Sequence, residues 1–386
     1  MPKHKLLNVA FLSTSPPREC GLATFTQDLI EAIDVNHVVS TNVIAVNNSK
    51  HREYGDKVIY EIDQKNQKDY IELAEKLNHS KIDLLVIEHE YGIYGGDYGD
   101  YILDLLNNID IPVITTLHTI LREPNDKQKS IIKALSEKSI KIITMAKNTS
   151  KLLRTVYGVE PTKIEVIHHG VPVKLVPSRE SLKNKSGYSD KEIVSTFGLL
   201  SPGKGIEYAI EAISKISEVK NNILYLILGQ THPDQKDEAY REKLKALVIK
   251  NHLEENVKFV NKYLTKDEII QYLQMSDIYM TPYLSKDQAV SGTLAYAVGY
   301  GRAIVSTPYL YAKEMLSEER GLLAEFENSE SLFKCLEYIL DNPEAKTRME
   351  NNTIKLGKTM YWDIVAKRYT DVFMKSITLD EKIGVV

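Results

Sequence analysis

The sequence predicts an α/β protein made of two doubly wound domains of similar size. Short β-branched apolar runs alternate with longer amphipathic segments along the chain, which is typical of a parallel sheet with helices on both faces. The chain has 386 residues, a length that suits about two domains. A stretch rich in Pro, Ser, Lys and Gly, from Gly170 to Asp190, divides the alternating segments into two sets and predicts a linker.

Six strands and four helices are predicted in the first set. The predicted strands are Leu7–Leu12, Asn42–Ala45, Leu84–Ile87, Val113–Thr116, Ile140–Met145 and Ile164–Ile167. The predicted helices are Thr24–Ile33, Lys68–Leu77, Ile102–Asn107 and Lys127–Ser136.

The second set repeats the pattern with five strands and five helices. The predicted strands are Val194–Phe197, Leu224–Leu228, Val257–Phe259, Ile278–Met280 and Ala303–Ser306. The predicted helices are Glu207–Ile216, Glu238–Asn251, Lys266–Gln274, Thr293–Val298 and Ser331–Leu340. In open parallel sheets ligands bind beyond the carboxyl ends of the strands, so the loops at those ends are the candidate sites.

Composition excludes several classes of protein. Hydrophobic residues make up 43% and charged residues 26%, an ordinary globular mixture, and the net charge of −4 argues against a nucleic-acid partner. Two cysteines provide no disulfide framework, which favours a reducing, cytoplasmic compartment. We expect no transmembrane segment, because no apolar stretch approaches 18 residues, and we interpret the N-terminal apolar run as a first strand rather than a signal peptide.

The first candidate loop, Ser15–Thr24, directly follows the first strand. It contains Arg18 and Gly21 and leads into a helix. Free amides at a helix N-terminus attract phosphate, glycine allows close approach, and Arg18 can add a charge-assisted contact. An ordinary strand-to-helix turn explains the same residues equally well.

The second candidate loop, Ser201–Glu207, follows the first strand of the second domain. Lys204 lies between Gly203 and Gly205 just before a helix, a pattern suited to a diphosphate. The Gly-Lys-Ser/Thr ending of an ATPase P-loop is missing. The alternative is a solvated loop lysine.

The third candidate is Ser285–Tyr309, which predicts a loop, a helix, a tight turn and a strand. Ser291, Gly292 and Thr293 precede the helix, where their amides and hydroxyls can hold a second phosphate oxygen. A simple helix N-cap is the alternative.

Histidines and acidic residues gather at predicted strand ends in the first domain. His89 and His118 each follow a strand, and His169 follows a third beside His168, which we interpret as structural. Glu88 and Glu90 lie two residues apart, a spacing that favours a general acid/base pair, or an acceptor-binding loop. We expect no metal, because the histidines lack metal-ligand spacing and no Asp-x-Asp pair is present.

These motifs together resemble the retaining glycosyltransferases of glycosyltransferase family 4, which have the two-domain GT-B fold. The Gly21 loop is similar to the family's N-terminal Gly-rich loop, and His118 to its histidine near the donor sugar. The segment "IEVIHHGVP" (Ile164–Pro172) resembles the interdomain segment, with His169 where Asn is usual. "STFGLLSPGKGIEYAIEAI" (Ser195–Ile213) resembles the phosphate motif, with Lys204 in the lysine position and Leu199 in the arginine position.

The chain departs from the family's acidic motif, two glutamates separated by seven residues. An ungapped alignment on Gly301 puts Gln288 and Tyr296 at the two positions, and sliding by one residue gives Asp287 and Ala295. The resemblance therefore implies catalytic roles for His118, Lys204 and Gln288. It also implies phosphate or donor contacts from Gly21, Gly203, Gly205, the Ser291–Thr293 segment and Tyr296.

The resemblance also implies how the domains divide the work. Residues 1–172 form the acceptor side, and residues 173–363 bind the nucleotide sugar. A C-terminal helix over about 364–386 crosses back to the first domain. Acceptor-side candidates are Arg18, Glu88, His89, Glu90 and His169. We expect a mannose or glucose donor, with GDP-mannose favoured over UDP-glucose, and a saccharide or glycoconjugate acceptor.

Two alternatives follow from the missing glutamates: a glycoside phosphorylase on the same fold, and a sugar-binding protein without catalysis. A nicotinamide-dependent oxidoreductase is not favoured, since no Gly-x-Gly-x-x-Gly follows the first strand. The oligomeric state has no signature in the sequence.

Overall fold

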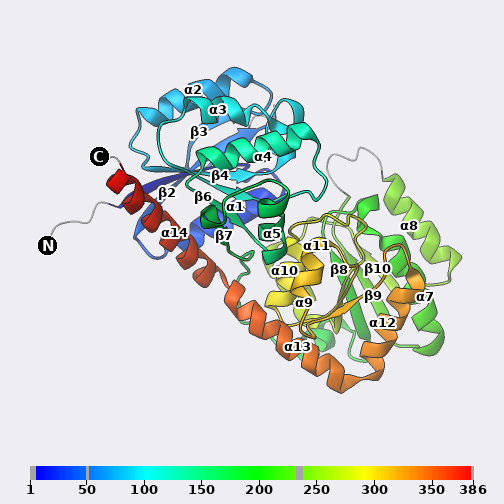
Figure 1. Ribbon diagram of the computed structural model, residues 1–386. Helices are drawn as coiled ribbons and strands as arrows, with labels where there is room; N and C mark the ends of the chain where they lie inside the picture. The colour runs from blue at the N-terminus through cyan, green and yellow to red at the C-terminus, as the bar shows by residue number, and fades with distance from the viewer. Residues whose placement is uncertain (1–5, 49–51, 232–237, 384–386) are drawn as a thin grey trace. The chain divides into compact units, whose positions relative to one another are not determined.

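The computed structural model describes residues 6–48, 52–231 and 238–383, with side chains up to residue 377 (Figure 1). The chain folds into two compact units. Unit 1 comprises Met1–Gly170 with Trp362–Val386, and unit 2 comprises Val171–Tyr361. The C-terminal helix thus returns to the first unit, as predicted. The last residues of that predicted helix, 384–386, lie outside the described residues.

Unit 1 contains a seven-stranded parallel sheet in the order β3-β2-β1-β4-β5-β6-β7. Every residue of β4 and β5 is buried, so helices cover both faces of the central sheet, and this explains why these strands are continuous apolar runs. The strands are β1 (Leu7–Ser13), β2 (Val39–Asn47), β3 (Val58–Asp63), β4 (Leu84–His89), β5 (Val113–Leu117), β6 (Lys141–Thr144) and β7 (Ile164–Val166).

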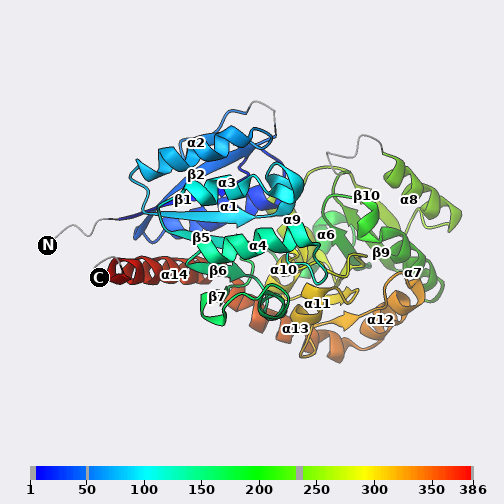
Figure 2. The same cartoon turned by 45° about the horizontal axis from the view of Figure 1, so that its top comes forward.

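The helices of unit 1 pack in two groups. Helices α2, α3 and α4 lie side by side in Figures 1 and 2, and α1 packs against α14. Their bounds are α1 (Gly21–Asp34), α2 (Gln67–Asn78), α3 (Ile102–Asn108), α4 (Asp126–Lys138), α5 (Lys147–Thr155) and α14 (Trp362–Ile383).

Unit 2 contains a six-stranded parallel sheet in the order β10-β9-β8-β11-β12-β13. Its strands are β8 (Glu192–Phe197), β9 (Ile223–Leu228), β10 (Val257–Val260), β11 (Ile278–Thr281), β12 (Ala303–Ser306) and β13 (Leu322–Leu323). Its helices are α6 (Arg179–Ser186), α7 (Ile206–Val219), α8 (Ala239–Lys250), α9 (Lys266–Met275), α10 (Gly292–Gly299), α11 (Leu310–Met315), α12 (Ser329–Asp341) and α13 (Pro343–Gly357).

Strand order creates one switch point in each sheet. In unit 1 the order reverses between β1 and β4, and in unit 2 it reverses between β8 and β11. At each switch point the loops that follow the two adjacent strands run in opposite directions. In unit 1 these are the loops after β1 and β4, and in unit 2 those after β8 and β11. Their divergence leaves a crevice at the carboxyl ends of the strands. The predicted glycine loops follow β1 and β8, so both lie at switch points.

The predicted linker, Gly170–Asp190, is wrong in its second half, because Arg179–Ser186 forms α6 within unit 2. The Ser178 hydroxyl accepts a hydrogen bond from the Ser181 amide at the start of α6, and Gly187 ends it in the left-handed conformation. Lys183 on this helix binds the buried Asp277 carboxylate at 2.5 Å. Helices α5, α11 and α13 and strands β3 and β13 are also additions to the predicted elements.

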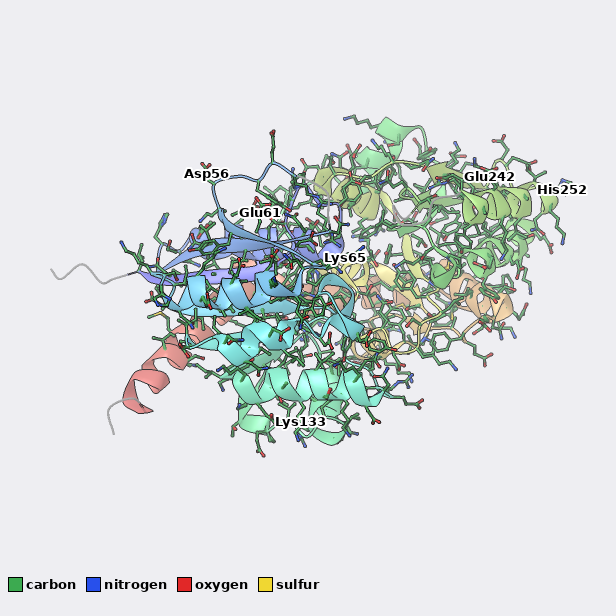
Figure 3. All side chains as sticks on the ribbon, turned by 90° about the horizontal axis from the view of Figure 1, so that it is seen from above. Asp56, Glu61, Lys65, Lys133, Glu242 and His252 are labelled. Atoms are coloured by element: carbon green, nitrogen blue, oxygen red, sulfur yellow. The ribbon has the colours of Figure 1, made fainter. Side chains whose placement is uncertain are left out.

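Charged side chains cover the outer faces of the helices. Lys133 on α4 and Glu242 on α8 are exposed in Figure 3, with side-chain exposures of 65% and 62%. Among the described residues, no helix combines the length and apolar character needed to span a membrane.

Candidate functional site

The switch point of unit 2 brings Lys204 onto the face of Tyr283. The Lys204 Nζ lies 3.9 Å from the centroid of the Tyr283 ring, a cation–π contact. The loop that carries Lys204 is held by Gly205, whose φ is +62° and where an added Cβ would lie 2.1 Å from the Pro282 carbonyl oxygen. Only glycine fits this close approach, so the predicted Gly-Lys-Gly pattern has a steric basis at its second glycine.

Helix α10 begins beside the same tyrosine. The Ser291 side chain caps the helix by accepting a hydrogen bond from the Leu294 amide at 3.3 Å. The hydroxyls of Thr293 and Tyr283 are 2.8 Å apart, and those of Ser291 and Thr293 are 3.1 Å apart. Three of the predicted positions, Lys204, Ser291 and Thr293, thus meet at one place through Tyr283.

We call Lys204, Tyr283, Ser291 and Thr293 the phosphate cluster. It combines one cation, three hydroxyls and the positive end of a helix dipole, which are the groups that bind phosphate oxygens. Gly198 is a close neighbour of the cluster, since an added Cβ there would be 3.5 Å from the Thr293 Cγ2. The sequence prediction missed Tyr283, and its position two residues after the end of β11 is the signal that could have found it.

The two residues aligned with the missing glutamates make different contacts. Gln288 donates a hydrogen bond from Nε2 to the Val290 carbonyl at 3.0 Å, so its amide is bound within its own loop. Tyr296 on α10 is 7% exposed, and its ring packs edge-on against Phe197, with centroids 6.3 Å apart. The amide of Gln288 and the ring of Tyr296 are therefore engaged with the protein in this structure.

The first loop of unit 1 is organised by a residue that the sequence prediction left out. Cys20 caps α1, and its Sγ accepts a hydrogen bond from the Ala23 amide at 3.4 Å and lies 3.1 Å from the Thr14 hydroxyl. Gly21 is the first residue of α1 and has open space where a Cβ would lie, so packing alone does not require glycine there. Arg18 donates to the Val46 carbonyl at 3.4 Å.

Glu88 and His118 form a buried pair at the carboxyl ends of the neighbouring strands β4 and β5. The Glu88 Oε2 lies 2.7 Å from the His118 Nε2, and the two side chains are 0% and 12% exposed. Glu88 is the fifth residue of the buried strand β4, and His118 directly follows β5, its neighbour in the sheet. The pairing of β4 with β5 therefore brings together two residues that are 30 positions apart.

The predicted acid/base pairing of Glu88 with Glu90 stays a prediction. Strand β4 ends at His89, Glu90 follows in extended backbone, and Glu88 contacts His118. Glu90 instead accepts hydrogen bonds from the Tyr91 amide at 3.0 Å and the Thr119 hydroxyl at 2.5 Å. The structure gives each carboxylate its own partner.

His89 is not positioned to touch an acceptor. Its side chain is fully buried, and its ring stacks on Tyr94 with centroids 6.0 Å apart. In the part of the chain that the structure describes, neither ring nitrogen has a hydrogen-bond partner. Burial, with a smaller contribution from His118, lowers the pKa of His89 from 6.5 to about 3. Glu88 is equally buried, so the expectation of direct acceptor contact is corrected for both residues.

His169 packs with Phe25 and Trp362 in an aromatic cluster. Phe25 makes edge contacts with His118, His169 and Trp362 at centroid distances of 4.9, 5.1 and 5.4 Å. His169 is 9% exposed, and burial lowers its pKa from 6.5 to about 4, although a hydrogen bond to the Gly170 carbonyl opposes this. His168 contacts the Met145 carbonyl at 3.0 Å. Phe25 was absent from the prediction because its apolar side chain carries no chemical signal.

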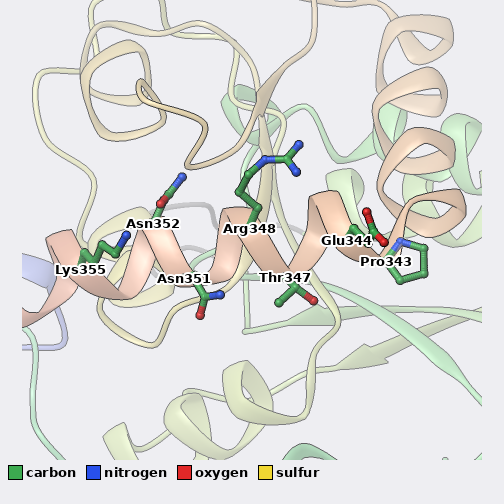
Figure 4. A pocket seen from close by; sticks show the side chains of 7 residues that line it. All are labelled: Pro343, Glu344, Thr347, Arg348, Asn351, Asn352 and Lys355. Atoms are coloured by element: carbon green, nitrogen blue, oxygen red, sulfur yellow. The ribbon is translucent and has the colours of Figure 1, made fainter.

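Two further features define what the described residues offer. They contain no group of three or more His, Cys, Asp or Glu side chains that could hold a metal ion. A groove of about 520 Å³ runs along α13, and Figure 4 shows its seven lining side chains on that one helix. None of the predicted site residues lines this groove. The lining residues are Pro343, Glu344, Thr347, Arg348, Asn351, Asn352 and Lys355.

Comparison with known families identifies glycosyltransferase domains in both units. Residues 178–356 match the family described as glycosyl transferases group 1, and residues 59–175 match the family described as glycosyltransferase family 4. A D-inositol 3-phosphate glycosyltransferase of Corynebacterium glutamicum is 22% identical over 315 residues, 75% of this chain and 72% of that protein. An uncharacterized glycosyltransferase of Methanocaldococcus jannaschii is 20% identical over 367 residues, 93% of this chain and 95% of that protein.

Solved structures share the fold over nearly the whole chain. Sucrose-phosphate synthase from Thermosynechococcus elongatus superposes with a TM-score of 0.79 at 16% identity, covering 97% of this chain and all of that one. HepE from Anabaena in complex with UDP gives 0.75 at 13% identity, covering 96% and 100%. The fold is thus that of the two-domain GT-B proteins. With the family matches, it defines this protein as a glycosyltransferase.

Proposed function

We propose that this glycosyltransferase transfers a hexose, mannose or glucose, from a nucleotide sugar to a saccharide or glycoconjugate acceptor, with retention of the anomeric configuration and without a metal ion. The observation that carries the proposal is the phosphate cluster, in which Lys204 and the N-terminus of α10 converge at the switch point of unit 2. A cation and a helix N-terminus favour a diphosphate, the part shared by all nucleotide-sugar donors.

The proposed chemistry depends on the leaving group more than on a protein carboxylate. The bond between the anomeric carbon and the diphosphate oxygen breaks, and the acceptor oxygen bonds to the same face of that carbon. The acceptor proton passes to the departing phosphate oxygen. The protein then contributes by positioning the reactants and by stabilising the charge of the leaving diphosphate, to which the phosphate cluster is suited.

This mechanism accommodates the replacement of both motif glutamates. Gln288 keeps hydrogen-bonding capacity without charge, and we propose that it turns from Val290 toward the donor when the donor binds. Tyr296 offers a ring and a hydroxyl where ribose is bound in similar enzymes. One oxyanion-type donor is worth about 3 kcal/mol in the transition state, so Lys204 with the α10 amides provides a substantial part of the catalysis.

In unit 1 we assign His118 to the donor sugar and the nearby polar loop residues to the acceptor. Because Glu88 and His89 are fully buried, Arg18 and Glu90 are the acceptor candidates that retain exposed surface. His169 is 9% exposed, and we propose that it supports Phe25 and His118.

The donor base is the open part of the proposal. The resemblance favours GDP-mannose over UDP-glucose, whereas HepE, which shares the fold, was solved with UDP and with UDP-glucose. Both donors therefore belong in the first experiment, and the base is assigned by whichever nucleotide binds.

The test is calorimetric titration with GDP, UDP and ADP in the presence of a chelator. We expect micromolar binding of one nucleotide and a loss of about 1.5–3 kcal/mol, or about 10- to 100-fold in affinity, in Lys204→Ala. Lys334→Ala is the matched control, since Lys334 is 69% exposed on α12 of the same unit. Equal affinity of wild type and Lys204→Ala would remove the phosphate cluster from the donor site.

The same titration separates the alternatives. Absence of nucleotide binding, together with phosphate-dependent release of a sugar 1-phosphate from oligosaccharides, would establish a phosphorylase instead. Nucleotide-sugar binding with no turnover under any acceptor would leave a sugar-binding protein.

A further inference from the structure

Glu88 is a buried carboxylate whose side chain pairs with one other residue. Its Oε2 lies 2.7 Å from the His118 Nε2, its side chain is 0% exposed, and its buried Oε1 has no hydrogen-bond partner among the described residues. Within residues 6–48, 52–231 and 238–383, no lysine or arginine pairs with it. Removing a carboxylate from water without full pairing is costly, so Glu88 occupies this position at the expense of stability.

The surroundings of the pair are aromatic and largely uncharged. Tyr94 donates its hydroxyl hydrogen bond to the Glu88 backbone carbonyl at 2.9 Å, and Tyr369 of α14 lies near the carboxylate, with its hydroxyl 3.4 Å from that of Thr116. The ring of His118 contacts Phe25 of α1, and His118 is near enough to His89 and His169 to lower the pKa of each slightly. Burial lowers the pKa of both these histidines, to about 3 for His89 and about 4 for His169, so both are neutral at physiological pH.

The geometry favours one tautomer of the His118 ring. The Glu88 Oε2 lies 2.7 Å from Nε2, and an ionised carboxylate only accepts hydrogen bonds, so this contact is satisfied when the proton is on Nε2. Nδ1 is then left with a lone pair and can accept a hydrogen bond from a hydroxyl. The edge contact with Phe25 at 4.9 Å restricts the ring from a second side.

We propose that Glu88 is a positioning residue for glycosyl transfer: it fixes the Nε2–H tautomer and the orientation of His118, so that Nδ1 accepts a hydrogen bond from a hydroxyl of the sugar. The inference rests on the proposed contact of His118 with the donor sugar. Glu88 itself touches neither substrate. A carboxylate behind a histidine sets its tautomer and orientation. At metal-bound histidines the loss of such a partner costs about 10- to 100-fold in affinity or activity, and we expect a similar loss here.

The first arm of the test observes the tautomer directly and needs no substrate. The ring nitrogens of His118 are observed by ¹⁵N NMR in the full chain and assigned by their absence in His118→Gln. We expect the Nε2–H tautomer in the wild type and loss of that preference in Glu88→Leu, which cannot accept a hydrogen bond. A wild-type ring protonated on Nδ1, or an unchanged tautomer in Glu88→Leu, would overturn the proposal.

The second arm is a double-mutant cycle on donor turnover, using UDP-glucose and GDP-mannose and measuring release of the nucleoside diphosphate. We expect Glu88→Gln to lower kcat/KM by about 10- to 100-fold in the wild type and by less than about twofold in His118→Ala. Equal losses in both backgrounds would show that Glu88 does not act through His118. Glu137→Gln is the control, since Glu137 is 66% exposed on α4.

Stability separates positioning from a structural role. Glu88→Gln removes a poorly paired buried charge and keeps the shape of the side chain. We therefore expect the urea midpoint of unit 1 to be unchanged or higher. Unfolding is monitored by the fluorescence of Trp362, the one tryptophan of the chain. A lower midpoint together with the loss of rate would overturn the inference. If neither donor is turned over, the proposed function fails, and the tautomer measurement still decides the role of Glu88.

Discussion

The buried ring of His89 makes the stability of unit 1 depend on pH in a predictable way. Its side chain is fully buried, and both ring nitrogens lack hydrogen-bond partners within residues 6–48, 52–231 and 238–383, so protonation in the folded state would place an uncompensated charge in the core. Burial and the neighbouring His118 accordingly lower the pKa of His89 from 6.5 to about 3. In the unfolded chain His89 binds a proton as the pH falls below 6.5, whereas in the folded chain it stays neutral until the pH reaches about 3.

The sign and size of the effect follow from proton linkage. A lowered folded-state pKa gives stability that is fully present above 6.5 and is lost as the pH falls toward 3. At about pH 5, 1.5 units below the unfolded value, the loss is about 2 kcal/mol, because one unit corresponds to about 1.36 kcal/mol. His169, with a pKa lowered from 6.5 to about 4, adds a second loss of about 2 kcal/mol at the same pH.

The perturbation is His89→Phe, which keeps an aromatic ring against Tyr94 and removes the titrating group. Urea unfolding is followed at about pH 7.5 and about pH 5 through Trp362, which lies in unit 1. We expect the free energy of unfolding to fall between these pH values by about 2 kcal/mol less in the variant than in the wild type. Groups common to both proteins cancel in this comparison.

The control is His79→Gln, since His79 is exposed at the end of α2, and this change should leave the wild-type pH difference intact. An equal fall in the wild type and His89→Phe would refute the reasoning. It would mean that the folded protein holds a proton on His89 or satisfies its ring nitrogens.

The remaining predictions concern unit 2 and the proposed reaction. The Asp277 side chain is 5% exposed and binds Lys183 and Lys346. Asp277→Ala should therefore lower the free energy of unfolding of unit 2 by about 3–5 kcal/mol, measured by urea unfolding with circular dichroism. Gly205→Ala should weaken nucleotide binding by at least about tenfold, measured by calorimetry, since the left-handed φ costs about 1–2 kcal/mol and the new Cβ meets the Pro282 carbonyl. Chelation with EDTA should change turnover of the donor by less than about twofold, because in the proposed reaction Lys204 and the α10 amides stabilise the leaving diphosphate.

Each of these has an outcome that would contradict it. A loss below about 1 kcal/mol in Asp277→Ala would mean that the carboxylate is not needed to hold α6 and α13. Equal nucleotide affinity of wild type and Gly205→Ala would reject the steric argument. Restoration of EDTA-inhibited turnover by Mg²⁺ or Mn²⁺ would establish metal dependence.

Much of the fold follows from the sequence because its strands are buried on both faces. A strand such as β9, in which every residue is buried, appears as a continuous apolar run and is predicted to within a residue. Helix α6 was missed because it buries one apolar side chain, Leu182, and is held by ion pairs to Asp277 and Glu350, which lie far along the chain. Helix α13 buries the small or polar Ala345, Thr353 and Gly357 beside Met349, which weakens the apolar periodicity.

The sequence predicted which loops carry the site residues, but not which side chains contact one another. Lys204 and Ser291 lie at the ends of predicted elements, and parallel topology alone brings such ends to one edge of a sheet. The contacts of Lys204 with Tyr283 and of Glu88 with His118 depend on which strands are neighbours, and alternation of strands and helices does not give strand order.

Turnover of a nucleotide sugar tests the central claim most directly. Wild type and Lys204→Ala are incubated with UDP-glucose and with GDP-mannose in the presence of EDTA, and release of the nucleoside diphosphate is measured over time. The account predicts that one donor is consumed by the wild type and that Lys204→Ala lowers kcat by about 100-fold, as expected when a donor to a developing phosphate charge is removed. Consumption of neither donor, or equal rates for the two proteins, would contradict it.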